Sequence, residues 1–237
     1  IQANAPFNSL TNALSWFVAN TPELASLAPG EERSVTFTVK LRESFPIRRI
    51  SDKNYLLKVQ AEVDSPTLPP GTAADRTVSI ASLENKVVGA IAVDAQGYWR
   101  DAGSGFLNSG PYPPKVNRPT QYTIHWLVTN YATDVTNVQI SAYLQSGARF
   151  TGKAKTTAGA QPVINPNSGL VTWRIDSLPA TKGVVSAPAE AIFQIEVTPG
   201  VNLVGKSVSL LSETRLEAQD VFTGTMLAAM DGVLTTD

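Results

Sequence analysis

The chain has 237 residues, of which 43% are hydrophobic and 16% are charged, and its 19 basic residues nearly balance its 20 acidic ones. No cluster of lysine and arginine stands out, which argues against nucleic-acid binding. No apolar run approaches the roughly 18 residues that a membrane span needs. Cysteine is absent, which excludes disulfide bonds, thiolate catalysis and cysteine-based metal sites.

Alternation of apolar and polar residues marks strands in the first third of the chain. A short segment, ALSWFV, carries Trp16, and longer alternating segments follow at residues 34–41 (SVTFTVKL) and 55–63 (YLLKVQAEV). Period-two alternation bounded by Pro and Gly predicts strands with one apolar face. The apolar faces consist of Val35, Phe37, Val39 and Leu41 in the first long segment and Leu57, Val59 and Val63 in the second.

The same pattern continues from residue 86 to the end of the chain. The segment TQYTIHWLVTN (120–130) places Tyr122, Ile124 and Trp126 on one face, and LVTWRI (170–175) carries Trp173. Many short alternating strands separated by turn residues predict a β-sandwich. The expected strands are KVVGAIAVDA, TQYTIHWLVTN, NVQISAYL, LVTWRI, AEAIFQIEVT, SVSLLSETRLEA and MLAAMDGVLTT.

The last strands of the two halves repeat at a nearly constant separation. Trp16 and Trp173 are 157 residues apart, Phe37 and Phe193 are 156 apart, and the Leu-Leu pairs that end at residues 57 and 211 are 154 apart. A constant separation over successive strands indicates an internal repeat. Because Trp16 and Trp173 recur at equivalent places, and Trp126 shares a face with apolar neighbours, all three are expected to mark the core.

Three segments of the second copy resemble a known family. PPKVNRPTQYTIHWLVTN, DVTNVQISAYLQSGARFTGK and NPNSGLVTWRIDSLPA resemble the immunoglobulin-like repeats, described as DUF11-like or CARDB-like, of bacterial cell-surface proteins. With their SGPYPPKV lead-in they are most similar to repeats from surface proteins of ultra-small candidate-phyla bacteria. The LQSGARF turn and Arg118-Pro119 depart from the pattern of that family. The resemblance implies an extracellular structural or adhesive role, and it carries no catalytic motif.

The expected fold is all-β, with tandem immunoglobulin-like β-sandwiches of which the first lacks its N-terminal strands. Residues 86–237 form the complete sandwich, and residues 1–85 correspond only to the C-terminal half of one. The join near residues 83–87 has no Gly/Ser linker, which suggests a stiff connection.

A half-sandwich would leave its apolar faces and strand edges open. We expect an upstream segment of the same protein, or a cleaved part of it, to complete residues 1–85. Alternatives are strands donated by a neighbouring subunit, which would make the chain a homo-oligomer or polymer, and a small sheet folded against the second domain.

Candidate chemistry is sparse. His125, the only histidine, lies on the face of its strand opposite Tyr122 and Ile124, and partners for a catalytic triad or a zinc site are not expected. Asp94 and Asp101 lie in a glycine-rich stretch and are weak candidates for calcium, the only cofactor considered. A plain turn is the simpler interpretation of that stretch.

Aromatic side chains gather in the same region. Tyr98, Trp99, Phe106 and Tyr112 fall on a long, proline-rich loop that is expected where the two copies meet. Such residues can contact a protein or a glycan. Packing of the loop, over the sandwich end or against the preceding half-domain, is the favoured interpretation.

These observations predict a non-enzymatic, extracellular module of a surface layer, stalk or fibre that acts as a spacer and assembly unit. The alternative is an adhesin that binds a glycan or a host-cell protein through the aromatic loop. An enzyme is not expected, because no nucleophile–base pair and no cofactor motif is found.

Overall fold

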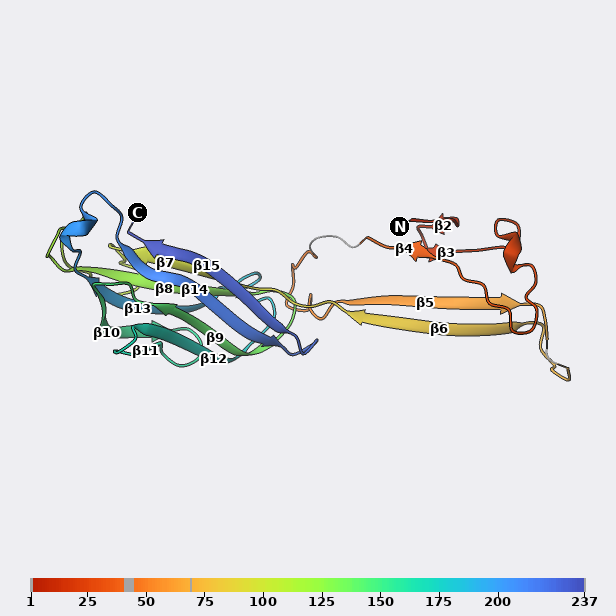
Figure 1. Ribbon diagram of the computed structural model, residues 1–237. Coiled ribbons are helices and arrows are strands. Elements are labelled where there is room, and N and C mark those ends of the chain that lie inside the picture. Colours follow the sequence, from red (N-terminus) through yellow and green to blue (C-terminus); the bar gives the residue numbers. More distant parts are fainter. Residues whose placement is uncertain (1, 41–44, 69, 237) are drawn as a thin grey trace. The chain divides into compact units, whose positions relative to one another are not determined.

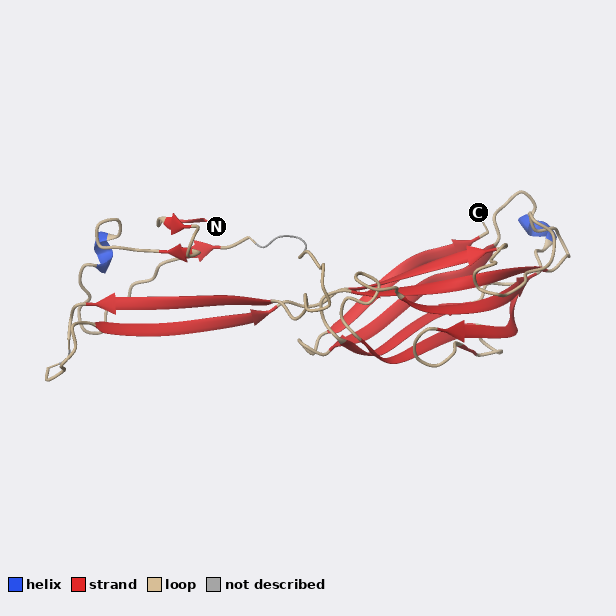
Figure 2. Cartoon of the chain, turned by 180° about the vertical axis from the view of Figure 1, so that it is seen from behind, coloured by secondary structure: helices blue, strands red, loops and turns tan. Residues whose placement is uncertain are grey.

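The computed structural model describes residues 2–40, 45–68 and 70–236. The chain forms two compact units, residues 1–46 and residues 47–237. Nearly all regular structure consists of strands, with two short 3₁₀ helices, η1 (Pro22–Leu24) and η2 (Val201–Leu203) (Figure 2). All pairings between the strands are antiparallel. The prediction of an all-β fold is confirmed.

The first unit contains only short strands. β1 (Gln2–Ala3) pairs with β4 (Phe37–Thr38), and β2 (Phe7–Asn8) pairs with β3 (Ala13–Leu14). The predicted strand over residues 34–41 is therefore reduced to two residues, and residue 41 lies outside the described part of the chain. Alternation alone does not make a strand: the backbone groups also need a partner strand along their length. Here β4 finds only a two-residue partner among the described residues.

The second unit begins with a long two-stranded ribbon. β5 (Leu56–Ser65) and β6 (Thr77–Lys86) pair over ten residues each, with Val59 opposite Leu83 and Ala61 opposite Ala81. In the described part of the chain neither strand pairs with any other. We call β5 and β6 the ribbon.

The rest of the second unit is a sandwich of two sheets (Figure 1). The four-stranded sheet has the order β10-β13-β8-β7, and the five-stranded sheet has the order β11-β12-β9-β14-β15. The strands are β7 (Ile91–Tyr98), β8 (Thr120–Asn130), β9 (Val135–Tyr143), β10 (Ala148–Thr156), β11 (Val163–Ile164), β12 (Leu170–Leu178), β13 (Ala189–Val197), β14 (Ser209–Asp220) and β15 (Met226–Thr235).

The inner faces of the two sheets form one core. Trp126 of β8 and Trp173 of β12 are fully buried, and the Trp126 ring meets the Phe193 ring edge-on at 5.0 Å between centroids. The alternation in TQYTIHWLVTN places Tyr122, Ile124 and Trp126 inside, as the sequence predicts. Trp16, in the first unit, is only partly buried, with its ring 6.2 Å from that of Phe37.

A four-residue link, Val87–Ala90, joins the ribbon to the sandwich and is held by the buried carboxylate of Asp220. This carboxylate accepts hydrogen bonds from the backbone N–H groups of Gly89 (2.9 Å), Phe222 (2.8 Å) and Thr223 (3.1 Å). A Cβ on Gly89 would lie 2.0 Å from Oγ1 of Thr133, so only glycine fits this close approach.

Side-chain contacts add to this attachment. Lys53 Nζ lies 2.8 Å from a carboxylate oxygen of Asp134, and Lys86 Nζ donates to the carbonyl oxygen of Phe222 at 2.8 Å. The link is therefore tied at several points to the loops at one end of the sandwich.

Burial by itself would raise the pKa of Asp220, but the hydrogen bonds from Gly89, Thr223 and Phe222 outweigh it and hold the pKa below its usual range. A carboxylate with a lowered pKa stabilises the fold above its unfolded-state pKa of about 3.9, and this stabilisation is lost as the pH falls through the folded-state value.

We predict that Asp220→Asn lowers the free energy of unfolding at pH 7 by about 2 kcal/mol, because one amide oxygen replaces two carboxylate oxygens. The loss of stability below pH 4 should be shallower in the variant. Thermal unfolding followed by circular dichroism from pH 7 to pH 2 measures both effects. Asp75→Asn, at an exposed carboxylate, is the control; equal acid sensitivity of all three proteins would contradict the prediction.

Candidate functional site

A long loop between β7 and β8 covers the outer face of the four-stranded sheet. Asn108 of this loop accepts a hydrogen bond from Nε2 of Gln194 at 2.7 Å and donates one to Oγ1 of Thr123 at 2.9 Å. Gln194 and Thr123 point away from the core, yet both are fully buried. The outer face of this sheet is therefore closed by its own loop, whereas alternation alone predicts a face in water.

His125 lies under the loop, between two carboxylates. Its Nε2 is 2.7 Å from Oδ2 of Asp101 in the loop, and its Nδ1 is 2.7 Å from Oε1 of Glu190 on β13. Only 12% of the His125 side chain and 10% of the Asp101 side chain are exposed. The sequence-based expectation that His125 has no partners is therefore wrong, because the loop brings Asp101 back over the sheet from 24 residues upstream.

The arrangement constrains what His125 can do chemically. Ionised carboxylates only accept hydrogen bonds, so both contacts are hydrogen bonds only when each ring nitrogen carries a proton. Burial would raise the pKa of Asp101, but hydrogen bonds from Ser104 and His125 outweigh it and keep the pKa below its usual range. With both nitrogens occupied, His125 cannot take a proton from a serine, so the group acts as a clamp that holds the loop on the sheet.

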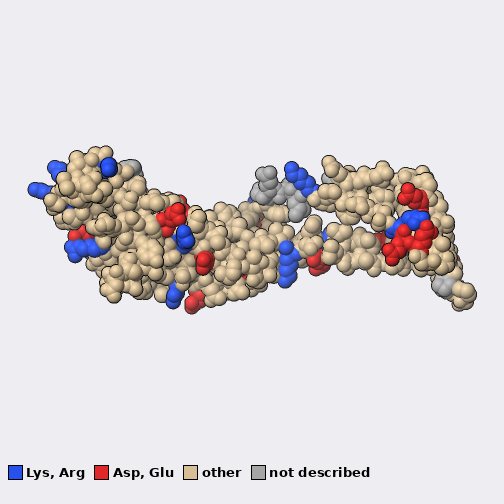
Figure 3. Space-filling model, in the orientation of Figure 1, with Lys and Arg blue, Asp and Glu red and all other residues tan. Residues whose placement is uncertain are grey.

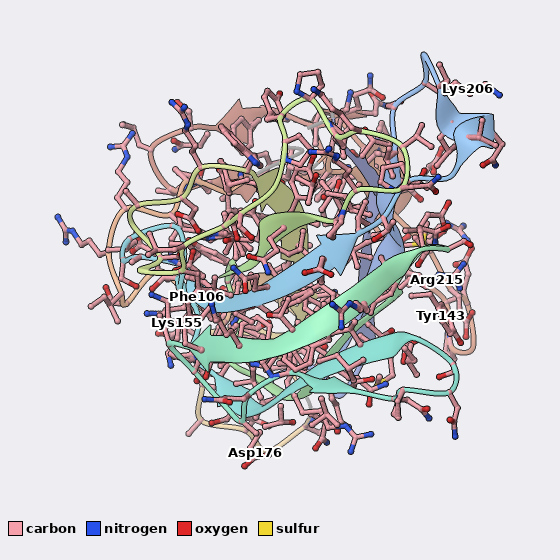
Figure 4. The ribbon with its side chains drawn as sticks, turned by 90° about the vertical axis from the view of Figure 1, so that its left-hand side faces the viewer. Phe106, Tyr143, Lys155, Asp176, Lys206 and Arg215 are labelled. Atoms are coloured by element: carbon pink, nitrogen blue, oxygen red, sulfur yellow. The ribbon has the colours of Figure 1, made fainter. Side chains whose placement is uncertain are left out.

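A second set of contacts fixes the middle of the loop. Lys155 of β10 donates to the carbonyl oxygen of Ser104, and its ammonium lies 5.5 Å from the centroid of the Phe106 ring. Figure 4 shows Phe106 and Lys155 side by side. A cation over an aromatic ring is attracted by the negative ring face. Phe106, one of the predicted contact residues, therefore takes part in holding the loop.

The other three predicted aromatic residues come together in a cleft of about 570 Å³. Trp99 stacks on Tyr112 with 5.0 Å between ring centroids, and the guanidinium of Arg100 lies 4.9 Å from the Trp99 ring. The lining consists of Gly97, Tyr98, Trp99, Arg100, Tyr112, Tyr122, Thr235 and Thr236. We call this the aromatic cleft.

Two buried polar atoms of residues that line the cleft have no hydrogen-bond partner among the described residues, Nε1 of Trp99 and Oη of Tyr122. Burial, together with the nearby Tyr112, raises the pKa of Tyr122 to about 12. The Tyr122 hydroxyl therefore remains a neutral donor over the physiological range. Unsatisfied buried donors are costly, so a ligand that paired with them would gain free energy in this cleft.

The aromatic loop does not lie where the sequence predicts it. β7 begins next to the link at Ile91 and runs seven residues further to Tyr98, a distance of about 23 Å in an extended strand. The loop and the aromatic cleft therefore lie at the end of the sandwich away from the link. Sequence reasoning placed the loop at the join because it follows the join closely along the chain.

The two calcium candidates are engaged separately. Asp94 on β7 accepts a hydrogen bond from Nε2 of Gln96, whereas Asp101 contacts His125 and the backbone N–H of Ser104. Across residues 2–40, 45–68 and 70–236, no group of three His, Asp or Glu side chains has a metal-binding arrangement. No helix in the described residues is long and apolar enough to cross a membrane.

Charge does not mark a binding surface on the side of the sandwich drawn in Figure 3, where acidic and basic side chains are interspersed. Several ion pairs are exposed, such as Lys58 with Glu84 at 2.6 Å on the ribbon. Exposed pairs contribute little to stability. The ribbon therefore offers its apolar residues and its backbone edges, and not a charged patch, to any partner.

No family model matches the chain, and no curated protein matches it in sequence. Solved structures give a weak likeness to bacterial surface proteins. The chain covers 55% of BcpA, the major pilin subunit of Bacillus cereus, at 12% identity over 75% of its own length, with a TM-score of 0.37.

The C-terminal domain of the Streptococcus agalactiae antigen I/II polypeptide BspA shows 14% identity, with 67% of this chain and 53% of that chain covered and a TM-score of 0.33. For the full-length major pilin SpaD of Corynebacterium diphtheriae the identity is 9%, the coverage 85% and 64%, and the TM-score 0.36. The chain thus spans less than two thirds of each of these proteins, and the likeness is one of all-β architecture.

We predict that His125→Gln weakens the clamp, because glutamine can donate to only one of the two carboxylates. The free energy of unfolding should fall by about 2 kcal/mol, and trypsin should cleave faster at Arg100, next to Asp101. A double-mutant cycle with Asp101→Asn measures the coupling between the two side chains. Additive effects of the two substitutions would contradict the clamp.

Proposed function

We propose that the chain is a non-enzymatic structural module of a bacterial cell-surface protein. It acts outside the cell as a spacer and assembly unit in a surface layer, stalk or fibre, and it is of the immunoglobulin-like, DUF11-like or CARDB-like, repeat type that its motifs resemble. The observation that carries the proposal is the combination of one complete sandwich with an equivalent ribbon that has no partner strand. Such an arrangement suits a chain of similar domains in which each unit must be completed.

The exposed side chains of the ribbon support a role in assembly. Val63 is 66% exposed, and Ile80 and Leu83 are each 60% exposed. Full burial of one large aliphatic side chain is worth about 1.5–3 kcal/mol, so covering these residues would add substantially to the stability of the ribbon. Their exposure favours a further part of the same protein, or a neighbouring subunit in a homopolymer, as the partner of residues 1–85.

The link also supports a spacer role. Residues 87–90 contain a single glycine, and the link is held by the buried Asp220 and by Lys53 and Lys86. A short connection with several hydrogen bonds restricts movement far more than a Gly/Ser linker does. Successive modules joined in this way would keep a defined spacing.

The cellular location can be tested with antibodies raised against residues 86–237. We predict equal immunogold labelling of intact and permeabilised source cells, with the gold arranged along a layer or along fibres. Antibodies against a cytosolic protein of the same cells, which should label only after permeabilisation, are the control. Labelling that requires permeabilisation would refute the proposal.

The aromatic cleft favours a second candidate, an adhesin module that binds a glycan. Aromatic rings and unpaired polar donors such as Oη of Tyr122 are the groups that a sugar surface engages. On a glycan array, binding by the chain should be lost in Trp99→Ala and kept in Tyr143→Ala, a control at an exposed tyrosine outside the cleft. Absence of binding by the unchanged chain, or equal loss in both variants, would remove this candidate.

A further inference from the structure

The ribbon has the same strand register as the last two strands of the complete sandwich. Leu57 lies opposite Asn85 in the ribbon, and the residues 154 and 149 positions later, Leu211 and Leu234, lie opposite each other in β14 and β15. Both strands of the β14–β15 pair have irregular register near residues 211–214, as β-bulges produce.

Beyond these irregularities the correspondence continues. Gln60 opposite Ser82 matches Arg215 opposite Met230, and Val63 opposite Ser79 matches Ala218 opposite Leu227. The ribbon strands β5 and β6 are therefore the counterparts of β14 and β15, in register as well as in order.

The complete sandwich shows which edge of such a ribbon requires a partner. The second edge of β14 is filled by β9, with Arg215 opposite Ser141 and Leu216 opposite Ile140. The second edge of β15 pairs with no strand of the described chain, since β15 ends the five-stranded sheet. By this correspondence the two ribbon edges differ: that of β5 should be paired, and that of β6 should stay free.

Side-chain burial shows the same difference between the copies. Leu216 and Ala218 of β14 are almost completely buried, whereas their counterparts Ala61 and Val63 on β5 are exposed. The β5 edge therefore lacks both its backbone partner and the cover over its apolar face. An unpaired edge of this length is a ready template for strand addition.

We propose that the free edge of β5 binds, in antiparallel orientation, a strand with the alternating pattern of β9 that belongs to the same polypeptide on the N-terminal side of residue 1. This rests on the proposed function, because it makes the ribbon part of a completed repeat. The register follows from the second copy: Gln60 lies opposite the counterpart of Ser141, and Ala61 lies opposite the counterpart of Ile140.

Two observations favour this source over a second copy of the chain. In the complete copy β9 ends 30 residues before Trp173, so the same strand order places the counterpart ahead of Trp16 by more residues than residues 1–15 provide. A folded second copy cannot lend its own β9, because that strand lies between β12 and β14 with Val138 and Ile140 buried in the core.

The experiment places a duplicate of residues 87–157 directly before residue 1 of the full chain, so that the duplicate meets the first copy at the 157-residue repeat. The chain contains no cysteine, which allows disulfide trapping with two introduced thiols only. One is Ser141→Cys in the duplicate, and the other is Gln60→Cys on β5 or, as the matched control, Ser82→Cys on β6. Gln60 and Ser82 lie opposite each other, and both are exposed.

We expect an intramolecular disulfide with Gln60→Cys and its loss with Ser82→Cys, together with slower amide exchange along β5 in the extended chain than in the original chain. Equal trapping at the two positions, trapping at Ser82→Cys alone, or unchanged exchange of the β5 amides would overturn the proposal. Because the duplicate might disturb folding, the unextended chain is also tested with a synthetic peptide of residues 134–144 that carries Ser141→Cys. Trapping at Gln60→Cys supports the proposed edge and register, and failure to trap at Gln60→Cys in both formats overturns them.

A disulfide-linked dimer formed by Gln60→Cys of the unextended chain alone would identify a second copy as the occupant and overturn the stated source. Failure of strand docking is distinguishable from failure of the proposed function. Trapping uses the purified chain and concerns only the β5 edge, whereas immunogold labelling of cells concerns only where the module acts.

Discussion

Each sheet must bury its apolar face against another layer, and the rest of the structure depends on this constraint. In residues 91–235 it is met by the two sheets together, and the contact between Trp126 and Phe193 lies at the centre of their shared core. The ribbon has the same strand pattern but no opposing layer within its own compact unit, so Val63 and Leu83 remain exposed. The difference between the two copies is therefore one of completeness and not of sequence type.

The outer face of the four-stranded sheet shows how polar residues can also be buried. Gln194, Thr123 and His125 would each be ordinary solvent-facing residues if the loop between β7 and β8 were short. Because the loop returns over the sheet, each requires a partner, and Asn108, Asp101 and Glu190 provide them. The contribution of this layer is rigidity at the end of the sandwich that carries the aromatic cleft.

The two ends of the sandwich thus have different properties. At one end Asp220 and the neighbouring loops hold the link to the ribbon through backbone N–H groups. At the other end Trp99, Tyr112 and Arg100 surround a cleft with unpaired donors. One end suits connection between modules, and the other suits contact with a ligand or a neighbouring molecule, which is consistent with a module that is repeated along a surface structure.

The sequence by itself determined the all-β class, the strands of the second copy and the inward face of TQYTIHWLVTN, because period-two alternation directly reports which side chains face a core. It also determined the repeat that relates β5 to β14. Only the tertiary structure decided that His125 has two carboxylate partners, that the aromatic loop lies away from the link, and that residues 34–41 form a strand of only two residues. Each of these depends on where a loop returns or on whether a partner strand is present, and neither is encoded in local alternation.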